Sequence, residues 1–221
     1  TDAIRKALSM GADKAVHVVD DALVGSDREA GDDGYFEFFD GRGGNDTIDG
    51  RGGMDWVYYN TARSGVNVNL QAGVASVDGY GGSDTLAGIE GVRGSTFADT
   101  IVGADGGTVL EGLAGNDNLS GGDGADLIDG GAGNDVMAGG TGDDSYAVDS
   151  LGDVVVENAD EGIDLVKLNL AAAGTYTMAA GVDNVIVSGI RRSLESALSH
   201  QSRARADRPV GRVRSADADR L

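Results

Sequence analysis

The sequence predicts an all-β fold of stacked repeats, and three observations support this fold class. Residues 112–147 read GLAGNDNLS, GGDGADLID, GGAGNDVMA and GGTGDDSYA, which are four consecutive nine-residue units. Every unit has glycine at positions 1 and 4, aspartate at position 6 and a large side chain at position 8. The whole chain holds 38 glycines but a single proline, which favours a regular repeat over a disordered linker.

Each nonapeptide predicts a loop followed by a short strand. Positions 1 to 6 must turn sharply, and glycine permits the positive φ angles and close backbone approach that this requires. Side chains alternate along a strand, so the residue at position 8 points inward. One unit cannot bury that residue alone, so neighbouring units must stack. The inward residues are Leu119, Ile128, Met137 and Tyr146.

The aspartates at position 6 indicate a cation site. A carboxylate together with loop carbonyl groups makes an oxygen-only ligand set, which suits calcium better than zinc or copper. Nonapeptides of this pattern are a known signature of calcium-binding β-helices. The candidate ligands in this block are Asp117, Asp126, Asp135 and Asp144, with the loop glycines Gly112, Gly115, Gly121, Gly124, Gly130, Gly133, Gly139 and Gly142.

These four units resemble the RTX (repeats-in-toxin, haemolysin-type) calcium-binding family. The resemblance implies a parallel β-roll in which each turn uses two nonapeptides and calcium sits between loops eighteen residues apart. The aspartate pairs at this spacing are Asp99 with Asp117, Asp117 with Asp135, and Asp126 with Asp144. Thr108 stands where a further aspartate would pair with Asp126, so we expect that site to be weak or empty.

Further units lie earlier in the chain, as GRGGNDTID and GRGGMDWVY at residues 41–58 and GYGGSDTLA at 79–87. Their position-6 residues, also candidate ligands, are Asp46, Asp55 and Asp84. The loops of Asp46 and Asp55 are adjacent in sequence, so in the implied roll they lie on opposite sides and cannot share an ion. Ser64 stands eighteen residues after Asp46, so this block lacks the aspartate pairs found later.

The repeat region is predicted to span residues 25–147, with nonapeptides at 41–58, 79–87 and 94–147. Alternating Val66, Val68 and Leu70 predict a strand in the interruption after the second unit. Residues 148–190 lose the glycine loops but keep short β segments. We expect them to form a metal-free cap, because an uncovered sheet edge invites aggregation.

The two ends differ from the repeats. Residues 1–24 predict a helix from Asp2 to about Met10 and a strand over Ala15–Val19. Within them, IRKALSMGADKAVHV resembles part of the electron transfer flavoprotein β subunit, which implies a piece of an α/β nucleotide-binding domain. The alternative is a capping appendage or a fusion. Residues 191–221 carry eight arginines and few large apolar side chains, which predicts a disordered basic tail.

The net charge of −20 is carried by the body of the chain. This charge fits either a solvated surface or a cation-binding array whose self-repulsion opposes folding until calcium arrives. Nucleic acid is excluded as a partner of this body, because its phosphates would be repelled.

Several function classes lack their motifs. The absence of cysteine rules out a disulfide framework and thiolate metal sites. HExxH, GxSxG and GxxxxGK[ST] motifs are missing, so we predict that the chain is not an enzyme. No apolar run approaches the roughly 18 residues of a membrane helix, so no transmembrane segment is predicted.

The predicted function is a module that folds on binding several extracellular calcium ions. The RTX resemblance implies a secreted or cell-surface protein, exported by a type I secretion apparatus, in which the module is the tail of a toxin, exoenzyme or adhesin. Two alternatives remain, namely a structural spacer of a surface adhesin and a fragment related to the flavoprotein subunit.

Overall fold

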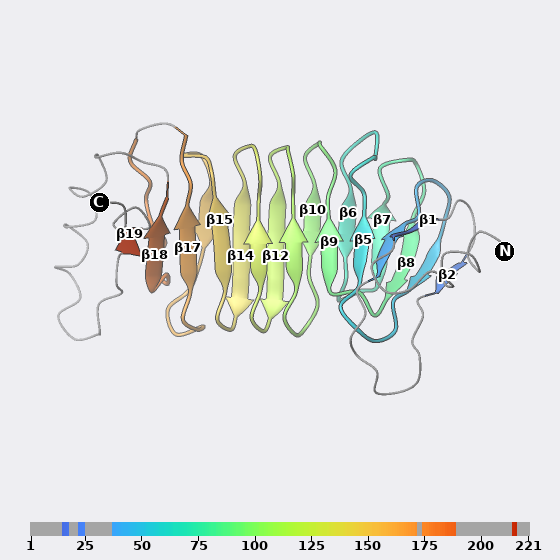
Figure 1. Cartoon of the computed structure of the whole chain (residues 1–221), viewed down its shortest axis with the longest axis horizontal. Helices are drawn as coiled ribbons and strands as arrows, with labels where there is room; N and C mark the ends of the chain where they lie inside the picture. The colour runs from blue at the N-terminus through green and yellow to red at the C-terminus, as the bar shows by residue number, and fades with distance from the viewer. Residues whose placement is uncertain (1–14, 18–21, 25–36, 172–173, 189–213, 216–221) are drawn as a thin grey trace, which may run out of the picture.

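The structure is a computed structural model that describes residues 15–17, 22–24, 37–171, 174–188 and 214–215. Within these residues every regular element is a β-strand, and the strands run across the long axis of the molecule (Figure 1). They form two sheets whose inward side chains make one apolar core. The predicted all-β parallel roll is confirmed.

The first sheet, sheet A, is parallel throughout, because each strand enters it from the same side of the roll. In spatial order its ten strands are β1 (Ala15–His17), β3 (Phe38–Asp40), β5 (Trp56–Tyr58), β9 (Gly91–Arg93), β11 (Val109–Glu111), β13 (Leu127–Asp129), β15 (Ser145–Val148), β17 (Leu165–Leu168), β18 (Asn184–Val187) and β19 (Arg214–Ser215).

The second sheet, sheet B, is parallel except at one strand, β7, which is antiparallel to both neighbours. In spatial order its nine strands are β16 (Val154–Val156), β14 (Val136–Thr141), β12 (Asn118–Asp123), β10 (Thr100–Val102), β6 (Asn67–Asn69), β7 (Val74–Val77), β8 (Asp84–Ala87), β4 (Thr47–Asp49) and β2 (Ala22–Val24).

The chain visits the two sheets alternately, one nonapeptide for each sheet. Residues eighteen apart are therefore register partners, as Leu119 and Met137 are in sheet B and Ile128 and Tyr146 are in sheet A. All four of these position-8 side chains are fully buried. The repeat length thus stacks identical positions, and the inward residues form two columns that meet in the core.

An inserted hairpin, β6–β7, interrupts this alternation in sheet B. In sheet A, β5 and β9 are direct neighbours, with Val57 opposite Val92, although 35 residues separate them. The hairpin adds two strands to sheet B that have no counterpart in sheet A. Strands lie about 4.8 Å apart, so sheet B is wider there by about 10 Å. The strand expected around Val68 is confirmed as β6.

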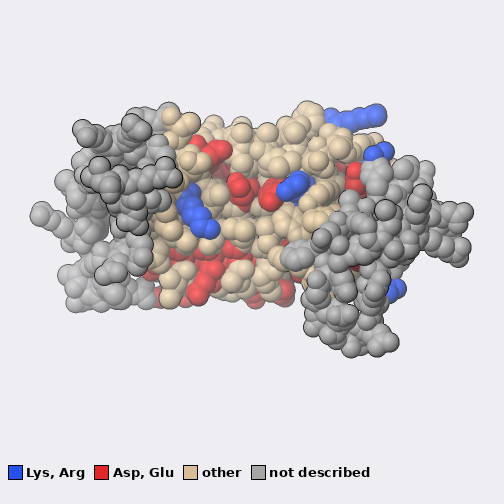
Figure 2. All heavy atoms as spheres, viewed as in Figure 1, with Lys and Arg blue, Asp and Glu red and all other residues tan. Residues whose placement is uncertain are grey.

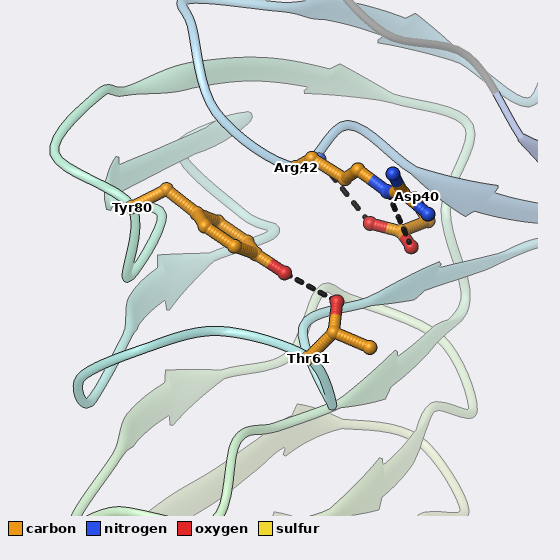
Figure 3. Close-up of polar contacts among 4 residues, drawn as sticks. All are labelled: Asp40, Arg42, Thr61 and Tyr80. Carbon is orange, nitrogen blue, oxygen red and sulfur yellow. Dashed lines mark hydrogen bonds and ion pairs between the residues drawn. The ribbon is translucent and has the colours of Figure 1, made fainter.

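The loops beside the hairpin pack against the first nonapeptide loop (Figure 3). The hydroxyl groups of Thr61 and Tyr80 are hydrogen-bonded to each other. A Cβ on Gly43, in that first loop, would lie 3.1 Å from the Cβ of Tyr80. The same loop is closed by Arg42, whose backbone N–H donates to Oδ1 of Asp40 over 3.2 Å. These contacts join the insertion to the start of the repeat region.

The ends of the chain differ in part from the predictions. The helix predicted near residues 2–10 and most of the basic tail lie outside the described residues. β1 covers the first three residues of the predicted strand and pairs with β3, so this segment extends sheet A. In the tail, where no structure was predicted, β19 pairs with β18, because the edge of a sheet offers unpaired backbone groups. No helix among the described residues is long and apolar enough to cross a membrane.

Candidate metal centres

Two rows of mostly acidic residues, which we call ladders, run along the roll. Each sheet has one ladder, at the edge where the loops lead into its strands. Each member directly precedes a strand or begins it, because position 6 of the nonapeptide is the last residue of the loop. The sheet B ladder contains Asp46, Asp84, Asp99, Asp117, Asp135 and Asp153. The sheet A ladder contains Glu37, Asp55, Glu90, Thr108, Asp126, Asp144, Asp164 and Asp183. Most ladder residues are buried, and the acidic side chains along the lower edge of the face in Figure 2 are further ones on the surface.

Hydrogen bonds connect successive turns of the sheet B ladder. The backbone N–H of Asp99 donates to Oδ1 of Asp117 over 2.8 Å, and the N–H of Asp117 donates to Oδ1 of Asp135 over 2.8 Å. The N–H of Asp135 in turn donates to Oδ1 of Asp153 over 3.1 Å. Each carboxylate therefore uses one oxygen to bind the backbone of the turn before it.

The sheet A ladder is built in the same way. The N–H of Asp126 donates to Oδ1 of Asp144 over 2.8 Å, and the N–H of Asp144 donates to Oδ1 of Asp164 over 3.0 Å. Thr108 donates both its N–H and its hydroxyl to Oδ1 of Asp126. The structure thus brings together the pairs expected at the eighteen-residue spacing, and it places a hydroxyl where the missing carboxylate would lie.

In six of the ladder carboxylates the second oxygen is buried without a partner. A buried polar atom left unpaired is costly, and a carboxylate oxygen especially so. Among the described residues this applies to Oδ2 of Asp55, Asp117, Asp126, Asp135, Asp144 and Asp164.

The glycine at position 1 makes room for that second oxygen. A Cβ on Gly112 would lie 2.4 Å from Oδ2 of Asp117, and a Cβ on Gly121 would lie 2.1 Å from Oδ2 of Asp126. Gly130 and Gly139 have the same relation to the aspartates five residues after them. Each carboxylate oxygen therefore sits in a cradle that any larger residue at position 1 would fill.

The glycine at position 4 lets consecutive loops approach through their backbones. A Cβ on Gly133 would lie 1.6 Å from the carbonyl oxygen of Gly115, and one on Gly142 would lie 1.9 Å from that of Gly124. Gly124 and Gly142 also have positive φ angles of 111° and 129°. Loop carbonyl groups therefore stack at the same spacing as the carboxylates, which supplies the oxygen-only ligand set expected for calcium.

Burial changes the acidity of the ladder. The pKa of Asp117, Asp135 and Asp144 is raised from the usual 3.8 to about 6, chiefly by burial and in smaller part by neighbouring carboxylates, against the opposing backbone hydrogen bonds. Burial likewise raises the pKa of Asp55 to about 7. At neutral pH these carboxyl groups carry negative charge at a cost, and either a proton or a cation relieves that cost.

The first repeat block is connected differently from the prediction. Asp46 donates its N–H to Oδ1 of Asp84, 38 residues later, and not to a group at Ser64. The hairpin inserts the extra residues between these two turns, which is why the eighteen-residue count fails. Asp55 lies in the other ladder, as expected, and donates its N–H to Oε2 of Glu90 over 2.9 Å.

Two predicted ligands have both side-chain oxygens engaged by protein groups. Oδ2 of Asp84 accepts the hydroxyl of Tyr59, and Oδ2 of Asp99 accepts the N–H of Ser95. Val66 and the Ser95 hydroxyl donate to Oδ1 of Asp99. These two carboxylates are therefore less available to an ion than the four aspartates of residues 112–147.

The prediction missed several members of the ladders. Asp153 stands eighteen residues after Asp135, a signal that the sequence contains. Asp164 and Asp183 follow their partners by 20 and 19 residues, so a strict period does not find them. Glu90 is a glutamate outside any nonapeptide. The ladders therefore continue into the segment that was predicted to be metal-free.

Comparison with curated proteins finds short matches to the N-terminal stretch. Over 27 residues, this chain is 78% identical to the electron transfer flavoprotein subunit beta of Mycobacterium leprae (strain TN) and of Mycobacterium tuberculosis (strain ATCC 25618 / H37Rv). The match covers 12% of this chain and 10% of those proteins, so the chain spans about a tenth of the length of the curated relatives it matches.

Comparison with protein-family models finds a match in segments that contain ladder residues. The model of the RTX calcium-binding nonapeptide repeat matches in 4 copies, over residues 30–61 and 111–146. The second range covers the four consecutive nonapeptides whose aspartates have an unpartnered oxygen. The chain therefore carries RTX calcium-binding nonapeptide repeats, folded as a parallel β-roll.

Proposed function

We propose that this calcium-binding repeat module is unfolded without calcium and folds as calcium ions enter between its turns. The observation that carries the proposal is the column of buried carboxylates, each with one oxygen bound to the neighbouring turn and one without a partner. Such an arrangement is costly when empty and becomes favourable when a cation binds the second oxygen.

Two free-energy costs oppose folding without calcium, and they explain why calcium binding and folding are coupled. Ordering glycine-rich loops costs more conformational entropy than ordering other residues. Like charges stacked one turn apart, such as Asp117 and Asp135, repel each other in the folded roll. Each ion that binds only the folded chain adds stability by mass action, so several sites together outweigh these costs.

The ligands of these ions come from both sides of each loop interface. We assign Oδ2 of Asp117, Asp126, Asp135 and Asp144 as the charged ligands, with carbonyl groups of the glycine loops completing the shell. Calcium accepts 6–8 oxygen ligands at flexible angles, which suits a mixture of carboxylate and backbone oxygen. Asp46, Asp55, Asp84 and Asp99 make the earlier and weaker sites.

The cellular setting follows from this coupling. Sites in extracellular modules bind calcium in the range of about 0.1–1 mM, so a repeat of this kind is empty in the cytosol and loaded outside. We therefore place the module in a secreted or cell-surface RTX-type protein, the tail of a toxin, exoenzyme or adhesin, with a type I secretion apparatus as its export partner. Its role there is to bind calcium, not to catalyse a reaction.

A second candidate is suggested by the flavoprotein match. In that case the N-terminal stretch would be part of a flavin-binding domain. The pairing of β1 with β3 instead makes residues 15–17 an extension of the roll. Absorption near 450 nm by the purified protein, roughly where flavins absorb, would favour the second candidate.

The test is a calcium titration followed by far-ultraviolet circular dichroism, starting from chelator-treated protein. We expect a cooperative transition from coil to β-structure with calcium, and no such transition with magnesium at the same concentration. A chain that is already folded in chelator, or that does not respond to calcium, would overturn the proposal.

A further inference from the structure

The last regular turn of the roll carries a glutamate, Glu157, at a place where the earlier turns have glycine. β14 and β16 are paired with Ala138 opposite Val156, so the next residues, Gly139 and Glu157, occupy equivalent places in successive turns. Gly121 occupies that place one turn earlier. A glutamate therefore stands where the nonapeptide has its position-1 glycine.

The repeat excludes a side chain at this place, and the local loop length explains why Glu157 is tolerated. A Cβ on Gly139 would lie 2.0 Å from Oδ2 of Asp144, which follows five residues later. After Glu157 the corresponding aspartate, Asp164, follows seven residues later. The two extra residues lengthen the loop, so the glutamate does not meet the aspartate of its own unit in the same way.

The side chain of Glu157 reaches back toward the preceding turn. One ligand oxygen from each of Asp144, Glu157 and Asp164 lies within 4.8 Å of the other two. The hydroxyl of Tyr146 donates to Oε1 of Glu157 and holds the carboxylate in this direction. The three carboxylates thus converge from two successive turns and from the strand end between them.

All three carboxylates are buried, and each has an oxygen without a donor partner. The residues are 1%, 9% and 1% exposed for Asp144, Glu157 and Asp164 respectively. Oδ2 of Asp144, Oε2 of Glu157 and Oδ2 of Asp164 accept no hydrogen bond from a protein N–H or hydroxyl group, and the Glu157 and Asp164 carboxyl groups are close enough to share a proton. No ion pair among the described residues joins any of them to lysine or arginine. Three buried carboxylates this close together are costly when charged, and a cation or protons would relieve that cost.

We infer that Asp144, Glu157 and Asp164 form a calcium site that closes the repeat array and that depends on Glu157. This inference rests on the proposed function, but it concerns a ligand that the nonapeptide does not contain. Three carboxylates and no nitrogen or sulfur atom select a hard cation, and the irregular loop suits calcium better than the strict octahedral geometry of magnesium.

The test compares Glu157→Gln with the matched control Glu161→Gln in the full chain. Both substitutions remove one negative charge from the same loop, but among the described residues the carboxylate of Glu161 accepts hydrogen bonds only from Asn158 in its own turn. Bound calcium is counted by equilibrium dialysis with elemental analysis over a range of free calcium. We expect Glu157→Gln to weaken one site by roughly tenfold or more, whereas Glu161→Gln leaves the binding curve unchanged.

A second variant, Glu157→Gly, restores the residue found at this place in the other turns. It removes the ligand without adding bulk, so it also loses one ion if the inference is correct. Circular dichroism in saturating calcium confirms that both variants fold. If the wild-type chain binds no calcium, the proposed function fails. If the wild type binds several ions and both variants bind as many with equal affinity, a shared proton neutralises the cluster and only this inference is overturned.

Discussion

Thr108 donates its backbone N–H and its hydroxyl to the same oxygen of Asp126, over 2.6 and 2.8 Å. One turn later, Asp126 donates only its N–H to Asp144, and its own carboxylate points into the glycine loop. The two interfaces share the same backbone geometry and differ by one charge. The sheet A ladder therefore keeps its backbone arrangement at Thr108 but has no carboxylate there.

Thr108→Asp should create a calcium site at this interface. The new carboxylate would stand eighteen residues before Asp126 and complete the pair that the neighbouring turns have. We expect one additional bound ion per chain in equilibrium dialysis. Thr175→Asp is the control, because Thr175 is exposed and outside both ladders. An unchanged ion count for the Thr108 variant would show that paired aspartates are not what defines a site.

Asp135→Ala should weaken two neighbouring interfaces at once. Asp135 accepts the N–H of Asp117 and donates its own N–H to Asp153, so its carboxylate belongs to the middle of the sheet B ladder. We expect the midpoint of the calcium titration to rise several-fold and its steepness to fall, measured by circular dichroism.

The control for that variant is Asp123→Ala, which removes an exposed carboxylate at position 3 of a nonapeptide. Asp123 accepts only the hydroxyl of Thr141. Its titration should match that of the wild type. Equal titrations for the two variants would mean that the buried ladder does not bind the ions.

The metal-free roll should be more stable in mild acid than at alkaline pH. The folded chain raises the pKa of Asp117, Asp135 and Asp144 to about 6, whereas these groups titrate near 3.8 when exposed. The folded state thus binds protons more tightly, so its stability is full below pH 3.8 and declines as pH rises through about 6. In chelator, we expect far-ultraviolet circular dichroism to show more β-structure at about pH 5.5 than at about pH 8.

Calcium should have the opposite pH dependence, because protons and ions compete for the same oxygens. The calcium concentration that half-saturates the sites should therefore be higher at about pH 5.5 than at about pH 8, as measured by equilibrium dialysis. A metal-free chain that becomes less ordered on mild acidification would contradict the assignment of buried, strained carboxylates.

Gly121→Ala should destabilise the roll, since the added Cβ would lie 2.1 Å from Oδ2 of Asp126. Gly52→Ala provides the control in another nonapeptide, because a Cβ there meets nothing within 4 Å. We expect the first variant to lower the thermal midpoint in saturating calcium and the second to leave it unchanged or raise it slightly. Similar losses for both variants would show that loop entropy, not the cradle, explains the position-1 glycine.

The regular part of the fold could be predicted because the same residue types recur at a fixed spacing. Position 8 of each nonapeptide is buried as expected, and aspartates eighteen residues apart, such as Asp117 and Asp135, are joined by a hydrogen bond. A period is a property of the sequence itself, so spacing alone reveals which residues stack. The same reasoning fails wherever the chain inserts residues between turns.

Three contacts show this failure in physical terms. Asp46 meets Asp84 because β4 and β8 are direct neighbours in sheet B, and the hairpin residues separate them only along the sequence. Asp164 follows Asp144 by 20 residues instead of 18, because the loop before Asp164 is two residues longer. The proposed role of Glu157 could not be predicted, because its side chain has room beside Asp144 only where the loop before Asp164 is longer than in the other turns. Each case requires knowledge of which strands are neighbours, which the sequence does not display.

The β6–β7 hairpin also determines how the array responds as a whole. In a linear stack, order passes only between neighbouring units. The hairpin separates the turns of Asp46 and Asp84 from those of Asp117 onward in sheet B, and Thr108 interrupts the charges of sheet A nearby. We therefore expect the array to fold as two cooperative units in series. Trp56, the single tryptophan, lies in the first unit, so its fluorescence should follow one half of a two-step transition.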